Sequence, residues 1–129
     1  MKPRVLIVDD DEVIARQLRW ILHDDYDVVI ANDMKTAVRH ATIHEPAISI
    51  VDLHLPPAVE SPHVGLRVME YIKGHLPSSK VLVITGAAGI QTRAASYAGG
   101  ADEFLVKPFE PEVLLATVRR MALQRLELV

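Results

Sequence analysis

The sequence predicts an α/β fold: a doubly wound, five-stranded parallel sheet with helices on both faces. Five short apolar segments rich in Val, Ile and Leu alternate along the chain with five segments whose apolar residues recur at helical spacing. Strands that alternate with helices in this way favour a parallel sheet, because each helix carries the chain back across one face. With 129 residues and no linker or repeat, residues 1–129 are expected to form one domain.

The expected elements follow from these two periodicities. The expected strands are residues 5–8, 26–31, 47–51, 80–86 and 101–108. The expected helices are residues 13–22, 34–44, 66–74, 90–98 and 110–128. Apolar residues that are expected to face the core include Val13, Ile14, Leu18, Ile21 and Leu22 in the first helix, Ala37, Val38, Ala41 and Ile43 in the second, and Val113, Leu114, Val118, Met121 and Leu128 in the last.

Four acids separate the first strand from the first helix. Asp11 and Glu12 directly precede the helix, where a carboxylate can accept hydrogen bonds from free backbone N–H groups and favours the positive end of the helix dipole. Asp9 and Asp10 follow the strand itself, and capping does not account for them. We therefore treat Asp9 and Asp10 as candidate site residues.

The second strand and helix carry few chemical groups. Asp33 is placed to cap the helix, and Pro46 ends the approach to the third strand. His40 and His44 are four positions apart on the helix, a spacing that can hold a metal. No third ligand lies near them in the sequence, so we expect two surface histidines.

The third strand is the most informative segment. It is apolar throughout apart from Ser49 and ends at Asp52, the position at which open α/β sheets place their ligands. A loop with three prolines and Gly65 follows, at residues 53–65. Taken alone, Asp52 is as well explained as the cap of the next turn.

The last two strands end in groups that bind anions. The fourth ends in Thr85, followed by the small residues 86–89, which leave the backbone open to a ligand or to movement but lack the spacing of a phosphate-binding glycine motif. The fifth ends in Lys107 before a proline. Acids and a proline at residues 110–112 are typical of the first turn of a helix.

Composition excludes several classes of protein. The net charge of −3 does not favour a nucleic-acid surface, and the absence of cysteine excludes disulfides and thiol chemistry. The apolar run near the N-terminus is too short for a signal peptide or a membrane span. We expect a cytoplasmic protein without a membrane or nucleic-acid partner for this domain.

The strand ends together predict one site. In a parallel sheet the carboxyl ends of all strands lie at one edge, so Asp9, Asp10, Asp52, Thr85 and Lys107 can converge there. Three carboxylates repel one another unless a cation lies among them, and oxygen ligands favour Mg²⁺, which commonly shares its shell with phosphate. A hydroxyl and an ammonium group can bind phosphoryl oxygens. The set predicts a Mg²⁺-dependent phosphoryl site with a carboxylate nucleophile.

This pattern resembles the receiver domain of two-component response regulators, along essentially the whole chain. The shared motifs are the acidic pair after the first strand, Asp52 with Pro56 four residues later, Thr85 with its small neighbour, and Lys107 before Pro108. Lys107 follows Thr85 by 22 positions, as in the family. The resemblance implies a flavodoxin-like fold, similar to chemotaxis Y proteins, with strand order 2-1-3-4-5.

The resemblance also implies a role for each site residue. Asp52 would be the phosphoacceptor and, with Asp10 and the backbone carbonyl of His54, would bind Mg²⁺ directly. Asp9 would act through water or as a second acidic ligand. Thr85 and Lys107 would hold phosphoryl oxygens. The domain would catalyse at most its own phosphorylation and dephosphorylation and would not be an enzyme in the wider sense.

The same resemblance implies a switch and its partners. Phe104 stands where the family has its switch aromatic, which turns inward as Thr85 moves toward the phosphate; a plain core role for Phe104 is an equal alternative. The surface formed by the fourth helix, fifth strand and fifth helix would change and meet a partner, with a homodimer as one case. The phosphoryl donor would be a sensor histidine kinase or a phosphotransfer protein. The apolar C-terminus suggests a receiver domain that forms the N-terminal part of a longer chain.

Two departures from the family pattern stand out. Gly65 follows Asp52 by 13 positions, where the family usually has a glycine after about eight, so the loop around 57–64 is roughly five residues longer than usual. This loop is expected to affect the choice of kinase or the lifetime of the phosphate. Phe replaces the commoner Tyr at position 104, which keeps the ring and loses a hydroxyl.

Two alternatives fit parts of the pattern. A haloacid-dehalogenase-type phosphohydrolase has an Asp-x-Asp motif after a strand, which Asp9 to Asp11 matches, but its later acidic pair would have to be Glu110 and Glu112 at a helix start. A pseudo-receiver would bind partners without phosphorylation, although the complete set of site residues disfavours it.

Overall fold

The computed structural model describes residues 2–86 and 90–127. Its strands are β1 (Arg4–Val8), β2 (Asp27–Ala31), β3 (Ile48–Val51), β4 (Lys80–Thr85) and β5 (Glu103–Val106). Its helices are α1 (Glu12–Leu22), α2 (Met34–His44), α3 (His63–His75), α4 (Ile90–Ala98) and α5 (Pro111–Glu127). The small-residue segment 87–89 and residues 128–129, with the predicted core residue Leu128, lie outside the described residues.

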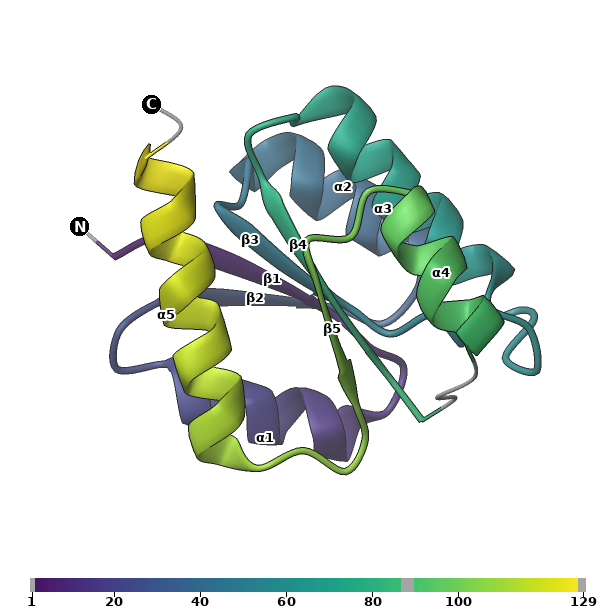
Figure 1. Ribbon diagram of the computed structural model, residues 1–129, viewed down its shortest axis with the longest axis horizontal. Coiled ribbons are helices and arrows are strands. Elements are labelled where there is room, and N and C mark those ends of the chain that lie inside the picture. Colours follow the sequence, from purple (N-terminus) through teal and green to yellow (C-terminus); the bar gives the residue numbers. More distant parts are fainter. Residues whose placement is uncertain (1, 87–89, 128–129) are drawn as a thin grey trace.

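The strands form one parallel sheet in the order β2-β1-β3-β4-β5 (Figure 1). This is the expected order, and the doubly wound fold is confirmed. The central strands β1, β3 and β4 are buried along almost their whole length, which explains why their sequences are continuously apolar rather than alternating. At register positions Val8 and Val51, β1 and β3 end side by side.

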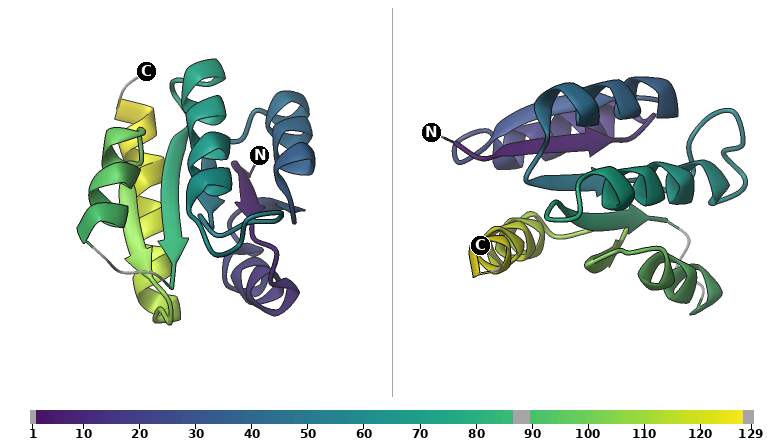
Figure 2. Two further views of the ribbon diagram at one scale, coloured as in Figure 1. Left: turned by 90° about the vertical axis from the view of Figure 1, so that its right-hand side faces the viewer. Right: turned by 90° about the horizontal axis from the view of Figure 1, so that it is seen from above.

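Helices cover the sheet on both faces and divide the core in two (Figures 1 and 2). On one face α1 and α5 pack over Val5, Ile7 and Ile50, and on the other α2 and α3 pack over Leu6 and Val51. Successive residues of β1 therefore enter opposite cores, as the period of two in a strand requires. Helix α4 packs against the edge strand β5.

Helix α1 begins where the acids predicted. The Asp11 carboxylate accepts hydrogen bonds from the backbone N–H groups of Val13, at 2.9 Å, and Ile14, at 3.3 Å. The capping role is confirmed for Asp11 and accounts for two of the free N–H groups in the first turn.

Some boundaries and burial assignments were wrong. Helix α3 begins at His63, three residues before the expected start, because the apolar periodicity becomes visible only after the prolines. Val13, Ile43 and Val113 were expected in the core but are exposed, at 72%, 64% and 48%. In α1 the expected core residues Leu18 and Leu22 are buried, together with Ala15.

Candidate functional site

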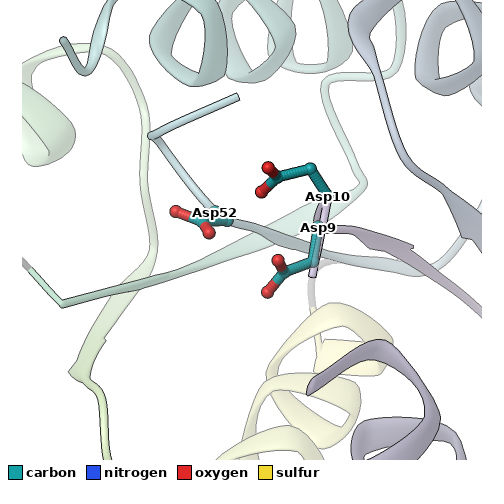
Figure 3. A group of neighbouring side chains, drawn as sticks. All are labelled: Asp9, Asp10 and Asp52. Carbon is teal, nitrogen blue, oxygen red and sulfur yellow. The ribbon is translucent and has the colours of Figure 1, made fainter. Parts of the chain in front are cut away.

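The carboxyl ends of β1 and β3 bring the predicted acids together (Figure 3). The backbone N–H of Asp52 donates to the Val8 carbonyl at 2.8 Å, and that of Asp9 donates to the Ala31 carbonyl at 3.0 Å. Each aspartate is thus held by one further backbone hydrogen bond between neighbouring strands, immediately after its own strand ends. The side chains of Asp9, Asp10 and Asp52 come from two neighbouring strands and lie next to each other.

This acidic cluster suits a divalent cation. One carboxylate oxygen from each of Asp9, Asp10 and Asp52 lies within 4.8 Å of the others. Asp9 and Asp52 are buried, at 2% and 7% exposure, whereas Asp10 is exposed. A set of oxygen ligands that is open to water on one side is what Mg²⁺ prefers, since this ion keeps several water molecules. The residues present therefore fit the expected metal.

Lys107 lies between two of these carboxylates. Its Nζ atom is 3.0 Å from Asp9 Oδ2 and 2.9 Å from Asp52 Oδ2. Its backbone N–H donates to the Thr85 carbonyl at 2.9 Å, which continues the pairing of β5 with β4 beyond the last strand residue. The long side chain of Lys107, directly after the edge strand β5, thus reaches the carboxylates at the ends of β1 and β3.

Burial and charge shift the protonation of this group. Desolvation raises the pKa of Asp9 to about 6, and the Asp52 charge adds to the rise, although the Asp11 N–H group and the Lys107 ammonium oppose it. Burial alone would lower the pKa of Lys107, but its hydrogen bonds to Asp52 and Asp9 outweigh this, so its pKa is raised. The lysine therefore stays charged, and the buried Asp9 carboxyl is costly to ionise without a further cation.

The remaining predicted residues surround this centre. The backbone N–H of His54 donates to Asp52 Oδ1 at 3.0 Å, and the residues Asp52, His54, Gly86 and Lys107 line one hollow of about 390 Å³. Thr85 is fully buried at the end of β4.

Phe104 is buried within the α2–α3 side of the core, and the Arg93 guanidinium lies 5.5 Å from its ring centroid. This position agrees equally well with a plain core role and with the inward position of a switch aromatic. The contact from Arg93 on α4 was not predicted, because nothing in the spacing of α4 indicates which residue faces β5.

The structure explains why position 65, next to the site, is occupied by glycine. Its N–H donates to the Leu53 carbonyl at 3.0 Å, so the first turn of α3 rests directly on the chain after Asp52. A Cβ atom at this position would overlap the Leu53 Cα and would lie 2.6 Å from the Asp52 carbonyl oxygen. Glycine is required here by close packing of two backbones rather than by an unusual φ angle.

Asn32 supports the end of β1, a role that was not predicted from the sequence. Its side-chain amide donates to the Asp9 backbone carbonyl at 3.0 Å and so ties the end of β1 to the end of β2. The only sequence signal was its place directly after the second strand, at the same edge as the acids.

The pair His40 and His44 is not a metal site among the described residues. Their rings lie against each other, with centroids 5.4 Å apart, and His44 Nδ1 is 3.2 Å from an Arg4 guanidinium nitrogen. Both residues are half-buried. The three-ligand cluster found in the described part of the chain is the aspartate group.

Comparison with known proteins decides the family. The family model of the response regulator receiver domain matches residues 5–119. This chain belongs to the response regulator receiver domain family. The membership that the motifs suggested is therefore confirmed, and receiver domains of this family are signalling domains of two-component systems rather than general enzymes.

Curated relatives place the receiver domain among bacterial regulators. The chain is 32% identical to the transcriptional regulatory protein PrrA of Mycobacterium bovis, covering 95% of this chain and 51% of that protein. It is also 32% identical to the response regulator MprA of Mycobacterium tuberculosis, covering 94% of this chain and 51% of that protein. The chain thus spans about half the length of these relatives.

Solved structures confirm the fold. A CheY-like receiver domain protein from Methanospirillum hungatei superposes with a TM-score of 0.92 at 25% identity, covering both chains completely. The BeF₃-activated DrrB receiver domain superposes with a TM-score of 0.85 at 25% identity, covering 94% of this chain and 97% of that one. In the described part of this chain, no helix has the length and apolar character needed to cross a membrane.

Proposed function

We propose that this receiver domain accepts a phosphoryl group on Asp52 in a Mg²⁺-dependent reaction. The donor is a phosphohistidine of a sensor histidine kinase or of a phosphotransfer protein, and the reaction takes place in the cytoplasm. The observation that carries the proposal is a buried aspartate whose carboxylate lies within one acidic cluster and is bound at 2.9 Å by a lysine from a distant strand.

The residues divide the chemistry between them. A carboxylate oxygen of Asp52 attacks the phosphorus atom as the bond from phosphorus to the donor nitrogen breaks, which leaves an acyl phosphate on Asp52. Asp9, Asp10 and Asp52, with the His54 backbone carbonyl, would hold Mg²⁺, which when bound neutralises charge on the phosphoryl oxygens. Lys107 would supply a positive charge to these oxygens, and Thr85 would supply a hydroxyl.

The proposed output is a change of the surface formed by α4, β5 and α5. Phe104 lies in β5 beneath α4, and Thr85 ends the neighbouring strand β4, so movement of one side chain changes the space open to the other. A partner protein or a second copy of the domain would bind this surface.

Intact-mass measurement after incubation with acetyl phosphate tests the proposal. With Mg²⁺ the protein should gain one phosphoryl group, and the gain should disappear with EDTA or in Asp52→Asn. The matched control is Asp24→Asn, which removes an exposed carboxylate outside the acidic cluster and should leave the gain unchanged.

The same measurement separates the alternatives. No gain on the wild-type protein would contradict the proposal and support a pseudo-receiver that only binds partners. Turnover of a phosphate ester that is lost in Asp9→Asn but kept in Asp52→Asn would support a phosphohydrolase instead.

A further inference from the structure

One lateral edge of the sheet is open. Strand β2 ends the strand order, and no strand of the described residues pairs with its outer side (Figure 1). At the end of β2 the Ala31 carbonyl accepts the Asp9 N–H at 3.0 Å, so Ala31 faces β1. Successive residues of a strand direct their backbone groups to opposite sides. The N–H and carbonyl groups of Val28 and Ile30 therefore point away from β1, to the open side.

This edge has none of the features that usually prevent pairing with another chain. Proteins protect edge strands with lysine, proline, a bulge or a covering element. The strand Asp27–Ala31 contains no lysine, proline or glycine, and it pairs with β1 in regular register along its whole length. At the opposite edge, α4 packs against β5, and Glu103 of β5 is bound by Arg120 of α5 at 2.6 Å. The outer side of β2 is thus the less protected of the two edges.

A hollow with two arginines lies beside this edge, between α1 and β2. It has a volume of about 280 Å³, and Arg16 and Arg19 of α1 and Ile30 of β2 contribute to its lining. Glu12 also lines the hollow and lies 3.6 Å from Arg16, but the two side chains are 73% and 77% exposed, so this ion pair is weak. Arg19 forms no ion pair within the described part of the chain. The hollow therefore has a surplus of positive charge.

Charge and strand alternation together indicate what would occupy the edge. The side chains of Val28 and Ile30 belong to the α1–α5 side of the core, and that of Val29 belongs to the other side. In a strand added next to β2, every second side chain would likewise lie on the α1 side, near Arg16 and Arg19. Acidic residues at these positions would match the charge. A second copy of this chain fits less well, because a twofold axis would bring the same two arginines of both copies together.

We propose that the open edge of β2 binds an extended segment of a partner protein as a sixth strand of the sheet, with acidic side chains at alternate positions near Arg16 and Arg19. Backbone hydrogen bonds to Val28 and Ile30 hold the segment, and the two arginines select its charge. This binding does not require phosphorylation of Asp52, so it stands or falls independently of the proposed function.

Amide hydrogen exchange measured by NMR tests the proposal with a defined probe, a hexapeptide of alternating glutamate and valine with blocked ends. In the free protein the N–H groups of Val28 and Ile30 should exchange faster than that of Val29, which faces β1. The peptide should slow exchange at Val28 and Ile30 and leave Val29 unchanged, because only the outward groups gain a partner. A matched peptide of alternating lysine and valine should have no effect.

N-methylation of the peptide separates strand addition from simple attraction between charges. Methyl groups on every second backbone nitrogen remove the hydrogen-bond donors from one side of an extended peptide. Methylation of one alternate set should abolish binding, and methylation of the other set should leave it unchanged, because only one side of the peptide faces β2.

Substitutions in the protein test the charge and the edge separately. Arg16→Gln and Arg19→Gln should each raise the Kd of the peptide by about two- to fivefold, the range for an exposed ion pair. The matched control is Arg67→Gln, at an exposed position of α3 outside the hollow, which should not change the Kd. Val28→Pro removes an outward donor that is not used in pairing with β1 and should raise the Kd roughly tenfold. If thermal unfolding shows that Val28→Pro does not fold, the arginine variants and the methylated peptides decide.

Three outcomes would overturn the proposal. The first is unchanged exchange at Val28 and Ile30 with the glutamate peptide at millimolar concentration. The second is equal binding of the lysine peptide, or an equal effect of both methylation patterns. The third is protection of both amides that rises with protein concentration in the absence of peptide, which would show that a second copy of the chain occupies the edge.

Discussion

The carboxyl ends and the amino ends of the strands each carry a cluster of Asp and Lys side chains. The two clusters have net charges of opposite sign. At the carboxyl edge one lysine, Lys107, is shared by Asp9 and Asp52, and Asp10 lies within reach of both. With all groups ionised, three negative charges face one positive charge. A metal ion is the direct way to balance such a surplus.

At the amino edge one aspartate is shared by two lysines. Asp102 lies 3.1 Å from the Lys73 ammonium and 3.6 Å from the Lys80 ammonium, and it also accepts the Val81 N–H at 2.9 Å. Here two positive charges face one negative charge, and Lys73 donates further to the Ser79 carbonyl at 2.9 Å. The Asp102 carboxylate has three donors, so this cluster clamps β4 to β5 and leaves no unpaired carboxylate for a cation.

The comparison shows that a buried ion pair does not by itself mark a site. Both clusters combine Lys and Asp at low exposure, but only the carboxyl edge has a surplus of carboxylates that the protein does not neutralise. The surplus, rather than the ion pair, indicates chemistry.

The largest expected effect is a difference in stability between substitutions at the two ends of α3. This helix runs from the carboxyl edge of the sheet to its amino edge. Gly65→Ala should lower the free energy of unfolding by about 3 kcal/mol, because its Cβ would overlap the Leu53 backbone. Gly74→Ala, with no atom within 4 Å of the new Cβ, should raise it by about 0.5–1 kcal/mol through the helix propensity of alanine. Urea unfolding of both variants measures this. Equal effects would show that the carboxyl edge is not the tightly built end.

The next effect tests whether the Asp102 cluster stabilises the fold while the aspartate cluster at the carboxyl edge binds Mg²⁺. Asp102→Asn should lower the free energy of unfolding by about 2 kcal/mol, because it removes the charge that two partly buried lysines share. It should leave Mg²⁺ affinity unchanged. Asp10→Asn, at an exposed position, should change stability little and weaken Mg²⁺ binding at least about tenfold. Calorimetric titration with Mg²⁺ checks both, and weakened binding in Asp102→Asn alone would reverse the assignment.

A further expected effect is the pH dependence that Asp9 contributes. Its pKa is raised from 3.8 to about 6 by burial, so between these values the folded state binds more protons than the unfolded chain. Stability from this group is therefore greatest at low pH and falls as pH rises to about 6, by at most about 1.4 kcal/mol per pH unit.

The measurement is the stability of Asp9→Asn relative to wild type in metal-free buffer. The difference should shift in favour of Asn from pH 4 to 6 and then level off. A difference that is independent of pH would show that Asp9 ionises normally, and added Mg²⁺ should reduce the difference at pH 7.

Much of the site could be predicted because each of its groups ends a strand. Asp9, Asp52, Thr85 and Lys107 are defined by the apolar runs before them, and parallel topology places all four at one edge. The strand order itself came from the resemblance to a family, since periodicity gives the elements but not their neighbours.

What the sequence did not indicate depends on contacts between distant segments. Helical spacing placed Val13 and Val113 on the apolar side of their helices. Packing decides which side of a helix meets the sheet, and both residues are exposed. The start of α3 was hidden by Pro62 and the short polar run before it, so the reason for Gly65 could not be seen until its contact with Leu53 was known. The hydrogen bond between His54 Nδ1 and the Val59 carbonyl is likewise a contact within an irregular loop, where no periodicity applies.

The most direct test of the central claim is to locate the phosphoryl group in the chain. An acyl phosphate on aspartate is reduced by borohydride to homoserine, whereas a free carboxylate is not. After incubation with acetyl phosphate and Mg²⁺, reduction and peptide mass spectrometry should find homoserine at position 52 and aspartate at positions 9, 10 and 102. Homoserine at position 9 or 10, with aspartate retained at position 52, would contradict the account.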